Sequence, residues 1–415
     1  MARIEFQAIS ATLLFILARP PRATGQVPEN PTVAQSVGVN IHFRNPQTGE
    51  LNMLAKTGVG WVRVDYLWTY VEKKPGEYDF STYDRLMEEF DVFHIRPIFI
   101  LDYTNPLYDE DLSPHSDAGR NAFAAWAAAS AAHFRERGIL WEIYNEPNRS
   151  FWKPEVNVQD YVLLAQVTTH AILKAAPGEA VIGPAVWGDD HDFLEACFQA
   201  HLLDSWAAVS IHPYRGEENP ETVTQTYGSL RRLMERYKPA NREVPIISSE
   251  WGYSAGSEKG ELDEALQGKL LARQWLVNLS ERIPVSIWYC WRDKDSGARY
   301  GLVSFPYHAG ANPVYQPKIA YRAAATLTAL LRGFRMSRRV SLASNDDYML
   351  EFRRGREARF AVWSERPGPH AVAVLLPGGK YSVTDFKGDT LPPISTTRGG
   401  RTTLTVTDGP IYLAP

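Results

Sequence analysis

The chain has few of the residues and motifs that mark metal sites or nucleic-acid binding. Only two of its 415 residues are cysteines, Cys197 and Cys290, and no CxxC, HExxH or close His/Cys cluster is present. We therefore predict neither a metal site nor a cofactor. Cys290 lies in an apolar run that predicts a buried strand, so we expect two free buried thiols rather than a disulfide. A formal net charge of −4 without a basic block argues against nucleic acid as a partner.

Long apolar runs are also scarce, and the first one is short. Residues 1–25 combine Arg3, the apolar stretch "AISATLLFILA" and small residues at 23–25, which together predict a signal peptide. This run is too short to span a bilayer comfortably, because spanning takes about 20 apolar residues. A retained N-terminal anchor is the alternative to a cleaved signal peptide. Both interpretations imply export, and we expect a periplasmic or secreted protein.

What the sequence does contain is an alternation of eight β-rich runs with amphipathic helical patterns over residues 33–334. The runs are mostly apolar throughout, as expected of parallel strands covered on both faces. They span residues 36–43, 61–68, 95–101, 138–145, 180–186, 208–214, 244–250 and 285–291. Eight such units predict an α/β protein with a (β/α)8 TIM barrel. A doubly wound open sheet is the competing arrangement, but the Gly-rich turn that usually follows its first strand is missing.

Residues 335–415 have a different pattern, with short alternating strands separated by Gly, Pro and Asp turns. This predicts a small C-terminal antiparallel β-sandwich domain. Its expected role is to cap or pack against the barrel. Sugar binding is the alternative, with Trp363 as the only tryptophan of this part.

Two glutamates stand out at the ends of predicted strands, where TIM barrels place their chemistry. Glu146 lies in "WEIYNEPN" after the fourth strand, and Glu250 lies in "PIISSEWG" at the end of the seventh. These strands face each other across the barrel mouth, so the two carboxyls can act as a pair on a glycosidic bond. Carboxyls about 5–5.5 Å apart would predict retention of configuration, and about 6.5–9.5 Å inversion. Two helix-capping acids are the structural alternative.

The motifs around these glutamates resemble those of a known enzyme group. "WEIYNEPN" and "PIISSEWGYS" are similar to motifs of the clan A retaining glycoside hydrolases. "SIHPY" (210–214), "SIWYCWRDKD" (286–295) and the barrel-plus-β-domain layout resemble family 39 of that group. "ILDYTNPLYDE", "RGILWEIYNEPNRSFWKP" and "YQPKIAYRAAATLTALLRG" point to its bacterial exopolysaccharide-associated branch, the PslG-type endoglycosidases. The resemblance covers residues 35–335 well and the rest loosely.

This resemblance implies roles for individual residues. Glu146 would be the general acid/base and Glu250 the nucleophile. Asn145 would hydrogen-bond the 2-hydroxyl of the sugar at the cleavage point. Arg63 would support the nucleophile, although it could instead pair structurally with an aspartate.

Further candidates have weaker patterns. His212 and Tyr214 match the strand-six motif that borders Glu250, with a core histidine and rim packing as the alternatives. Trp291, or else Trp288, would form the aromatic floor under the sugar. The remaining substrate-contacting candidates at the rim are His42, Asp102 and Trp187.

We therefore predict a retaining glycoside hydrolase that cleaves β-linkages of a polysaccharide by double displacement. The resemblance implies endo-action on a bacterial exopolysaccharide. The alternatives are an exo-acting β-xylosidase-like enzyme, a transglycosylase that uses the same residues, and a non-catalytic glycan-binding protein of a polysaccharide export system. We expect a monomer and leave an association with export machinery open.

Overall fold

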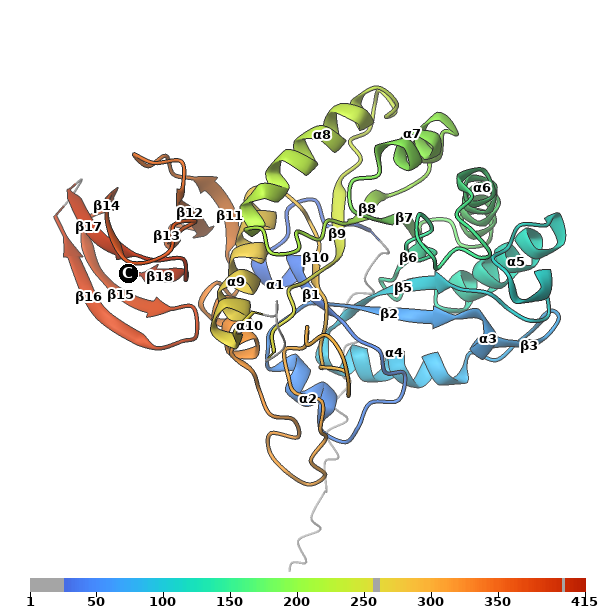
Figure 1. Ribbon diagram of the computed structural model, residues 1–415, viewed down its shortest axis with the longest axis horizontal. Coiled ribbons are helices and arrows are strands. Elements are labelled where there is room, and N and C mark those ends of the chain that lie inside the picture. Colours follow the sequence, from blue (N-terminus) through green and yellow to red (C-terminus); the bar gives the residue numbers. More distant parts are fainter. Residues whose placement is uncertain (1–25, 257–261, 398–399) are drawn as a thin grey trace, which may run out of the picture.

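The computed structural model describes residues 26–256, 262–397 and 400–415. The predicted signal peptide lies outside these residues. Figure 1 shows two bodies side by side, a barrel surrounded by helices and a smaller all-β part built from the last strands. Among the described residues, no helix combines the length and the apolar character needed to cross a bilayer.

Eight parallel strands close into the barrel, which confirms the predicted TIM-barrel class. Each strand pairs with the next along the chain, and the last pairs with the first. They are β1 (Val37–Asn40), β2 (Trp61–Leu67), β5 (Arg96–Asp102), β6 (Leu140–Ile143), β7 (Ala180–Trp187), β8 (Ala208–His212), β9 (Ile246–Trp251) and β10 (Ser286–Trp288). The carboxyl ends of all eight strands therefore meet at one mouth.

Helices form the outer ring of the barrel (Figure 1). They are α1 (Val33–Ser36), α2 (Glu50–Ala55), α3 (Trp68–Val71), α4 (Ser81–Phe93), α5 (Asp117–His133), α6 (Val158–Ala175), α7 (His191–Gln199), α8 (Val223–Glu235), α9 (Glu264–Ser280) and α10 (Ile319–Leu330). Short 3-10 turns are η1 (Asp109–Asp111), η2 (Leu202–Asp204) and η3 (Pro220–Thr222), and β3 (Glu72–Lys74) pairs with β4 (Glu77–Tyr78). Side chains of Ser116, Asn157 and Asp263 cap α5, α6 and α9 by accepting backbone amides.

The barrel interior changes from apolar to polar along its axis. Its lower layer is one apolar cluster, formed by Trp61, Ile98, Leu140, Ala180, Ile182, Ala208, Ile247, Val285 and Ile287. Successive residues of a strand point to opposite faces, so the next inward positions on β2 and β6 are Arg63 and Glu142. Both are buried. A layer of buried polar side chains thus lies directly above the apolar layer, toward the carboxyl ends of the strands.

The C-terminal part is antiparallel, as predicted, and forms two layers. One sheet has the order β11-β12-β13-β18-β15-β16, and β14 pairs with β17 in the other. The strands are β11 (Arg335–Arg339), β12 (Asp347–Arg354), β13 (Glu357–Ser364), β14 (His370–Leu375), β15 (Gly379–Asp385), β16 (Thr390–Thr396), β17 (Arg401–Val406) and β18 (Ile411–Ala414). Residues of both sheets enclose one apolar core.

Strand β13 joins the two bodies, because one of its faces packs into the β domain and the other packs against the barrel. Phe360 and Val362 belong to the core of the β domain, whereas Ala361 and Trp363 belong to the large cluster that continues into the barrel and its helices. Trp363 is fully buried, so it presents no face on which a sugar could stack. Sugar binding by the β domain would therefore have to use residues other than Trp363.

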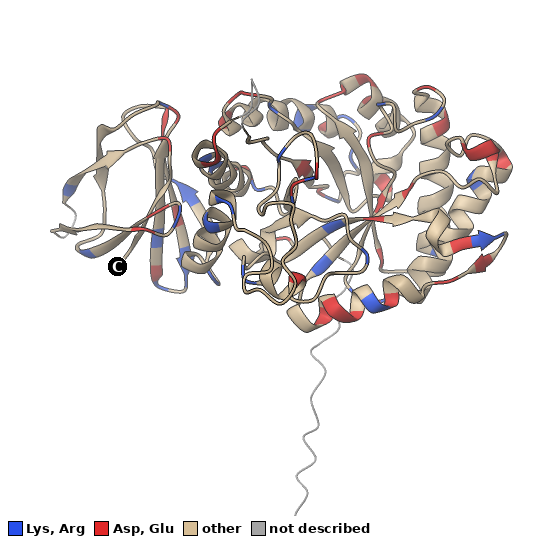
Figure 2. Ribbon diagram, turned by 60° about the horizontal axis from the view of Figure 1, so that its bottom comes forward, with Lys and Arg blue, Asp and Glu red and all other residues tan. Residues whose placement is uncertain are grey.

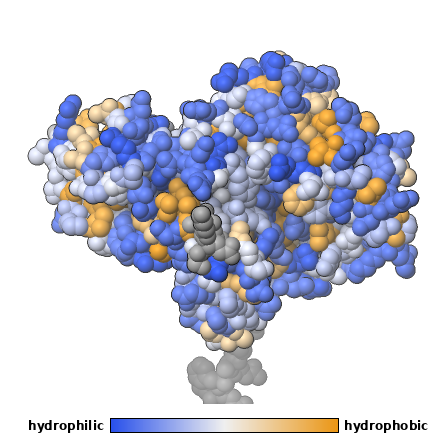
Figure 3. Space-filling model, in the orientation of Figure 1, coloured by the Kyte–Doolittle hydropathy of each residue, from blue (hydrophilic) through white to orange (hydrophobic). Residues whose placement is uncertain are grey.

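The surface is of ordinary mixed character. Charged residues of both signs are interspersed over the helices in Figure 2. On the face shown in Figure 3, hydrophobic residues lie in small patches separated by hydrophilic ones, as on globular proteins in general. Cys197 and Cys290 are buried and unpaired, as predicted.

Candidate active site

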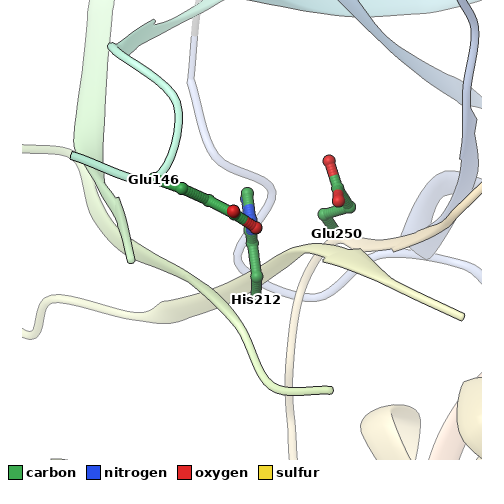
Figure 4. A group of neighbouring side chains, drawn as sticks. All are labelled: Glu146, His212 and Glu250. Carbon is green, nitrogen blue, oxygen red and sulfur yellow. The ribbon is translucent and has the colours of Figure 1, made fainter. Parts of the chain in front are cut away.

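Glu146 and Glu250 face each other at the mouth of the barrel (Figure 4). One carboxylate oxygen of each, together with one ring nitrogen of His212, lie within 4.8 Å of one another. Both glutamates line a cavity of about 710 Å³. Nearest oxygens this close favour the close carboxyl pair of a retaining enzyme over the gap of about 6.5–9.5 Å that an inverting enzyme needs for its water.

The inward position of Glu250 depends on an irregularity in β9. The pairing with β10 joins Ser286 to Ser248 but Trp288 to Trp251, so β9 contains one extra residue. Since Ile247 faces the interior, strict alternation would turn Glu250 outward. The bulge reverses the alternation and points the Glu250 carboxylate into the cavity.

A turn after β6 positions Glu146. Its backbone φ is 45°, in the left-handed region that non-glycine residues seldom adopt. Its amide donates to the carbonyl of Ala185 in β7 at 3.1 Å, and its carbonyl accepts the amide of Arg149 at 2.9 Å. The Asn-Glu-Pro turn is thereby tied to the neighbouring strand, which compensates for the unfavourable backbone conformation.

Arg63 is the centre of the polar layer beneath the two glutamates. It is 1% exposed, and its guanidinium donates to four side-chain oxygens. The partners are Glu142 Oε2 at 2.6 Å, Asn40 Oδ1 at 3.1 Å, Glu250 Oε2 at 2.7 Å and Asn145 Oδ1 at 2.8 Å. Sequence reasoning placed Arg63 beside the nucleophile but missed Glu142 and Asn40. Both are polar residues inside otherwise apolar strands, which is the signal that could have found them.

The charges of this layer depend on one another. Burial by itself lowers the pKa of Arg63, but Glu142 and Glu250 outweigh it, and the pKa lies above its ordinary value. Burial likewise raises the pKa of Glu142, while Arg63 and His212 bring it below its usual range. Arg63 is therefore a permanent cation whose position is set by two carboxylates.

His212 and Tyr214 contact different glutamates. The Tyr214 hydroxyl donates to Glu250 Oε1 at 2.8 Å. His212 Nδ1 lies 2.8 Å from Glu146 Oε1, and the imidazole is fully buried. We expected both residues beside Glu250. Tyr214 does contact Glu250, whereas His212 contacts Glu146. Burial raises the pKa of Tyr214, and the charge of Glu250 raises it further, so the phenol remains a donor.

A second group of ionisable side chains lies at the mouth and consists of His42, Asp65 and Asp102. His42 is exposed, and its Nδ1 lies 3.7 Å from Asp65 Oδ2. Asp102 is completely buried, and neither of its oxygens accepts a hydrogen bond from any described donor. Burial and the neighbouring Asp65 raise the pKa of Asp102 well above its usual range, so a protonated Asp102 can donate to Asp65. The expectation that Asp102 contacts substrate is corrected, because Asp102 has no exposed surface.

Trp288 and Trp291 do not form the aromatic floor that we expected. Both are buried, and their indole N–H groups donate to the Tyr300 carbonyl at 2.9 Å and to Glu50 Oε1 at 3.0 Å. Val285 and Ile287 face inward, so alternation continues to Tyr289, which lines the cavity. Tyr289 takes the position expected of a tryptophan, and sequence reasoning missed it.

Trp187 is placed at the rim of the cavity on the Glu146 side. It is 41% exposed and lines the cavity. The Arg149 guanidinium lies 4.4 Å from the centroid of its ring, and the Trp187 amide donates to Asn148 Oδ1 at 3.0 Å. The ring is thus held by residues of the turn that carries Glu146, and it remains a candidate platform for a sugar.

Glu146, His212 and Glu250 also have the composition of a metal-binding triad. A divalent cation would, however, have to share Glu250 with the Arg63 guanidinium at 2.7 Å. Because Arg63 already neutralises the Glu250 carboxylate and would repel a second cation bound to it, the triad is a poor fit for a metal.

Sequence comparisons relate the chain to glycosidases. A model of the cellulase family, glycosyl hydrolase family 5, matches residues 27–295. A beta-xylosidase of Geobacillus stearothermophilus is 28% identical over 240 residues, 49% of this chain and 46% of that protein. A 6-phospho-beta-glucosidase of Dickeya chrysanthemi is 24% identical over 156 residues, 34% of this chain and 33% of that protein. The chain thus spans less than half the length of these curated relatives.

Solved structures share the fold at low sequence identity. A family 39 glycoside hydrolase from Bacteroides cellulosilyticus superposes with a TM-score of 0.77 at 20% identity, covering 94% of this chain and 82% of that one. A family 39 beta-xylosidase from Caulobacter crescentus gives 0.67 at 16% identity, covering 94% and 97%. The agreement extends over both the barrel and the β domain.

Proposed function

The chain belongs to the cellulase family, glycosyl hydrolase family 5, and on that premise we propose that it is a retaining glycoside hydrolase that cleaves β-linkages of a polysaccharide. The observation that carries this proposal is the pair Glu146 and Glu250, with carboxylate oxygens within 4.8 Å of each other across a cavity. A sugar-binding protein has no need of two such carboxyls.

In the first step the nucleophile attacks. A carboxylate oxygen of Glu250 forms a bond to the anomeric carbon while the bond from that carbon to the leaving oxygen breaks. Glu146 gives its proton to the leaving oxygen. Arg63 at 2.7 Å and the Tyr214 hydroxyl at 2.8 Å hold one Glu250 oxygen each, which orients the carboxylate for attack.

In the second step the glycosyl-enzyme is hydrolysed. Glu146 takes a proton from water, the water oxygen attacks the anomeric carbon, and Glu250 leaves as a carboxylate. His212 Nδ1 at 2.8 Å from Glu146 Oε1 holds that carboxyl in place as it alternates between acid and base.

Asn145 is placed to recognise the substrate. Its Oδ1 accepts from Arg63 Nη2 at 2.8 Å, so the amide Nδ2 is the end left for a sugar hydroxyl. The exposed ring of Trp187 beside Glu146 supports a platform for the leaving sugar. His42 and Tyr289, whose rings meet edge-to-face at 5.4 Å, are the corresponding candidates on the other side.

We further propose family 39-like, endo-acting cleavage of a bacterial exopolysaccharide by an exported monomer, as in the PslG-type branch. The sequence motifs support this finer assignment, and the low-identity structural likeness to family 39 enzymes supports the fold alone. The beta-xylosidase relative favours exo-action on xylosides as the second candidate. A transglycosylase would use the same residues with a sugar as acceptor. An association with polysaccharide export machinery rests on the resemblance alone.

A mechanism-based label tests the proposal. Incubation with a series of 2-deoxy-2-fluoro β-glycosides, followed by peptide mass spectrometry, should place the label on Glu250. A label on another residue would refute the assigned nucleophile, and binding of polysaccharide without turnover would favour a glycan-binding protein. The size distribution of products separates endo- from exo-cleavage.

A further inference from the structure

The C-terminal β domain contacts the barrel through a buried carboxylate. In β13 the indole N–H of Trp363 donates to Glu221 Oε1 at 2.7 Å. Glu221 lies in η3, and Arg273 of α9 donates to both of its oxygens, at 2.9 Å from Nε and 2.6 Å from Nη2. All three side chains are buried. One carboxylate therefore joins the β domain, η3 and α9.

Glu221 ends the segment that links β8 to α8, here called the β8–α8 loop (residues 213–222). The other end of this loop is part of the active site. Tyr214, Arg215, Gly216 and Glu217 line the cavity, and Tyr214 donates to the nucleophile Glu250. Glu221 lies seven positions after Tyr214 (221 − 214), so the contact with the β domain and the contact with the catalytic carboxylate are close together along the loop.

The middle of the loop is held from the barrel side. The Tyr253 hydroxyl donates to the Glu218 carbonyl at 2.9 Å, and the Arg215 guanidinium donates to Thr226 Oγ1 at 3.2 Å. Apart from η3, the loop has no regular structure. Its position therefore depends on individual hydrogen bonds. Those of Glu221 involve a buried carboxylate, whose charge is costly to leave without partners.

We propose that Trp363 is a positioning residue of the active site, which holds the β8–α8 loop through Glu221 and so sets the place of Tyr214 against Glu250. This inference rests on the proposed glycosidase function of the cavity. It gives the β domain a role in catalysis in addition to covering the barrel. Removing the indole N–H leaves the Glu221 carboxylate buried with Arg273 as its remaining side-chain partner among the described residues, and such a charge is costly to keep in place.

The chain offers a matched control in the same interface. Lys269 of α9 donates to both oxygens of Asp408 in the β domain, at 2.9 and 3.1 Å. This ion pair joins the same two bodies as Trp363 does, but it does not involve the β8–α8 loop. Asp408→Asn therefore weakens domain packing without touching the proposed connection.

The experiment compares Trp363→Phe, which keeps an aromatic ring in the core but lacks the N–H, with Asp408→Asn and wild type. Hydrogen–deuterium exchange of residues 213–222 should be faster in Trp363→Phe only. Its kcat/KM on an aryl β-glycoside should fall about tenfold, mainly through kcat, and inactivation by a 2-fluoro glycoside should slow in parallel. Glu221→Gln serves as a second variant if Trp363→Phe does not fold, with the same expectation.

Two results would overturn the inference: unchanged loop exchange and kcat in the folded variant, or an equal effect in Asp408→Asn. If wild type cleaves no glycoside at all, the proposed function fails instead. The exchange measurement still decides in that case whether Trp363 holds the loop.

Discussion

Glu250 and Glu146 share one cavity but have different surroundings. Glu250 is in a barrel strand, and each of its oxygens accepts from a separate donor, Arg63 and Tyr214. Glu146 is in a turn with a left-handed backbone, and among the described side chains its hydrogen-bond partner is His212, whose ring nitrogen can donate or accept. Two donors thus fix the Glu250 carboxylate in place for attack, whereas the partner of Glu146 suits a carboxyl that gives and takes a proton in the proposed reaction. Identical residue types thus acquire the two roles that double displacement needs from their partners.

The largest effect should come from removing the fixed carboxylate. Glu250→Gln keeps the shape of the side chain but cannot form the glycosyl-enzyme, so kcat should fall about ten-thousandfold or more. Steady-state assays on aryl β-glycosides measure this. Glu217→Gln is the matched control, since Glu217 lines the same cavity and should stay within about tenfold of wild type. A Glu250→Gln variant with substantial turnover would remove the distinction between the two glutamates.

Changing the proton-exchanging carboxyl should give an effect that depends on the leaving group. Glu146→Gln cannot protonate a sugar leaving group, and we expect a loss of about a hundredfold to ten-thousandfold on natural substrates. A dinitrophenyl leaving group needs no proton, so most of the first-step rate should remain. Rates on a series of phenols of rising acidity test this. An equal loss along the whole series would argue against an acid role for Glu146.

The next effect concerns the cation that holds the nucleophile. A lysine at position 63 keeps the charge but cannot contact Glu142, Asn40, Glu250 and Asn145 at once, so kcat/KM should fall about a hundredfold for Arg63→Lys. Arg149→Lys, next to Trp187 on the Glu146 side, is the control and should affect aryl glycosides little. An equal loss of kcat/KM in both variants would mean that the function of Glu250 does not depend on the hydrogen bonds of Arg63.

The smallest effect is on stability, and it concerns Asp102, a buried acid at the mouth that differs from both glutamates. The pKa of Asp102 is raised by burial and by Asp65. The folded protein therefore retains this proton where the unfolded chain loses it, and stability falls as pH rises above about 3.8 toward the folded pKa. Asp102→Asn should remove this decline and match wild type at the acidic end. Unfolding temperatures measured across pH decide it, and an unchanged wild-type slope in the variant would contradict a protonated Asp102.

Asp65 should behave in the opposite way. Burial raises its pKa, but the hydrogen bond and charge of His42 bring it below the ordinary value. Its contribution to stability is therefore present above the ordinary pKa and lost as the pH falls through the folded pKa. Asp65→Asn should lower the unfolding temperature at neutral pH and approach wild type in acid.

The barrel and the meeting of Glu146 and Glu250 at its mouth could be predicted because they leave local signals. Eight apolar runs with helical patterns between them predict the fold, and a glutamate directly after such a run marks a strand end. Glu142 and Asn40 escaped notice because each lies within a strand and is useful only through Arg63. Their importance depends on which residues face the barrel interior, and closure of the barrel decides that.

The wrong expectations for Trp288 and Trp291 have the same origin. Aromatic residue type favoured the tryptophans, but alternation from Val285 and Ile287 selects Tyr289 over Trp288. Trp291 lies beyond the end of β10, and its indole donates to Glu50 instead of facing the cavity. The extra residue in β9 that turns Glu250 inward has no sequence signature of its own. The contact of Trp363 with Glu221 joins residues 142 positions apart, and no local pattern predicts it.

The stereochemistry of the product tests the central claim most directly. Proton NMR of the first product released from a β-glycoside should show the β-anomer, because two displacements at one carbon restore the starting configuration. Initial release of the α-anomer would mean a single displacement by water, and it would contradict the assignment of Glu250 as a nucleophile.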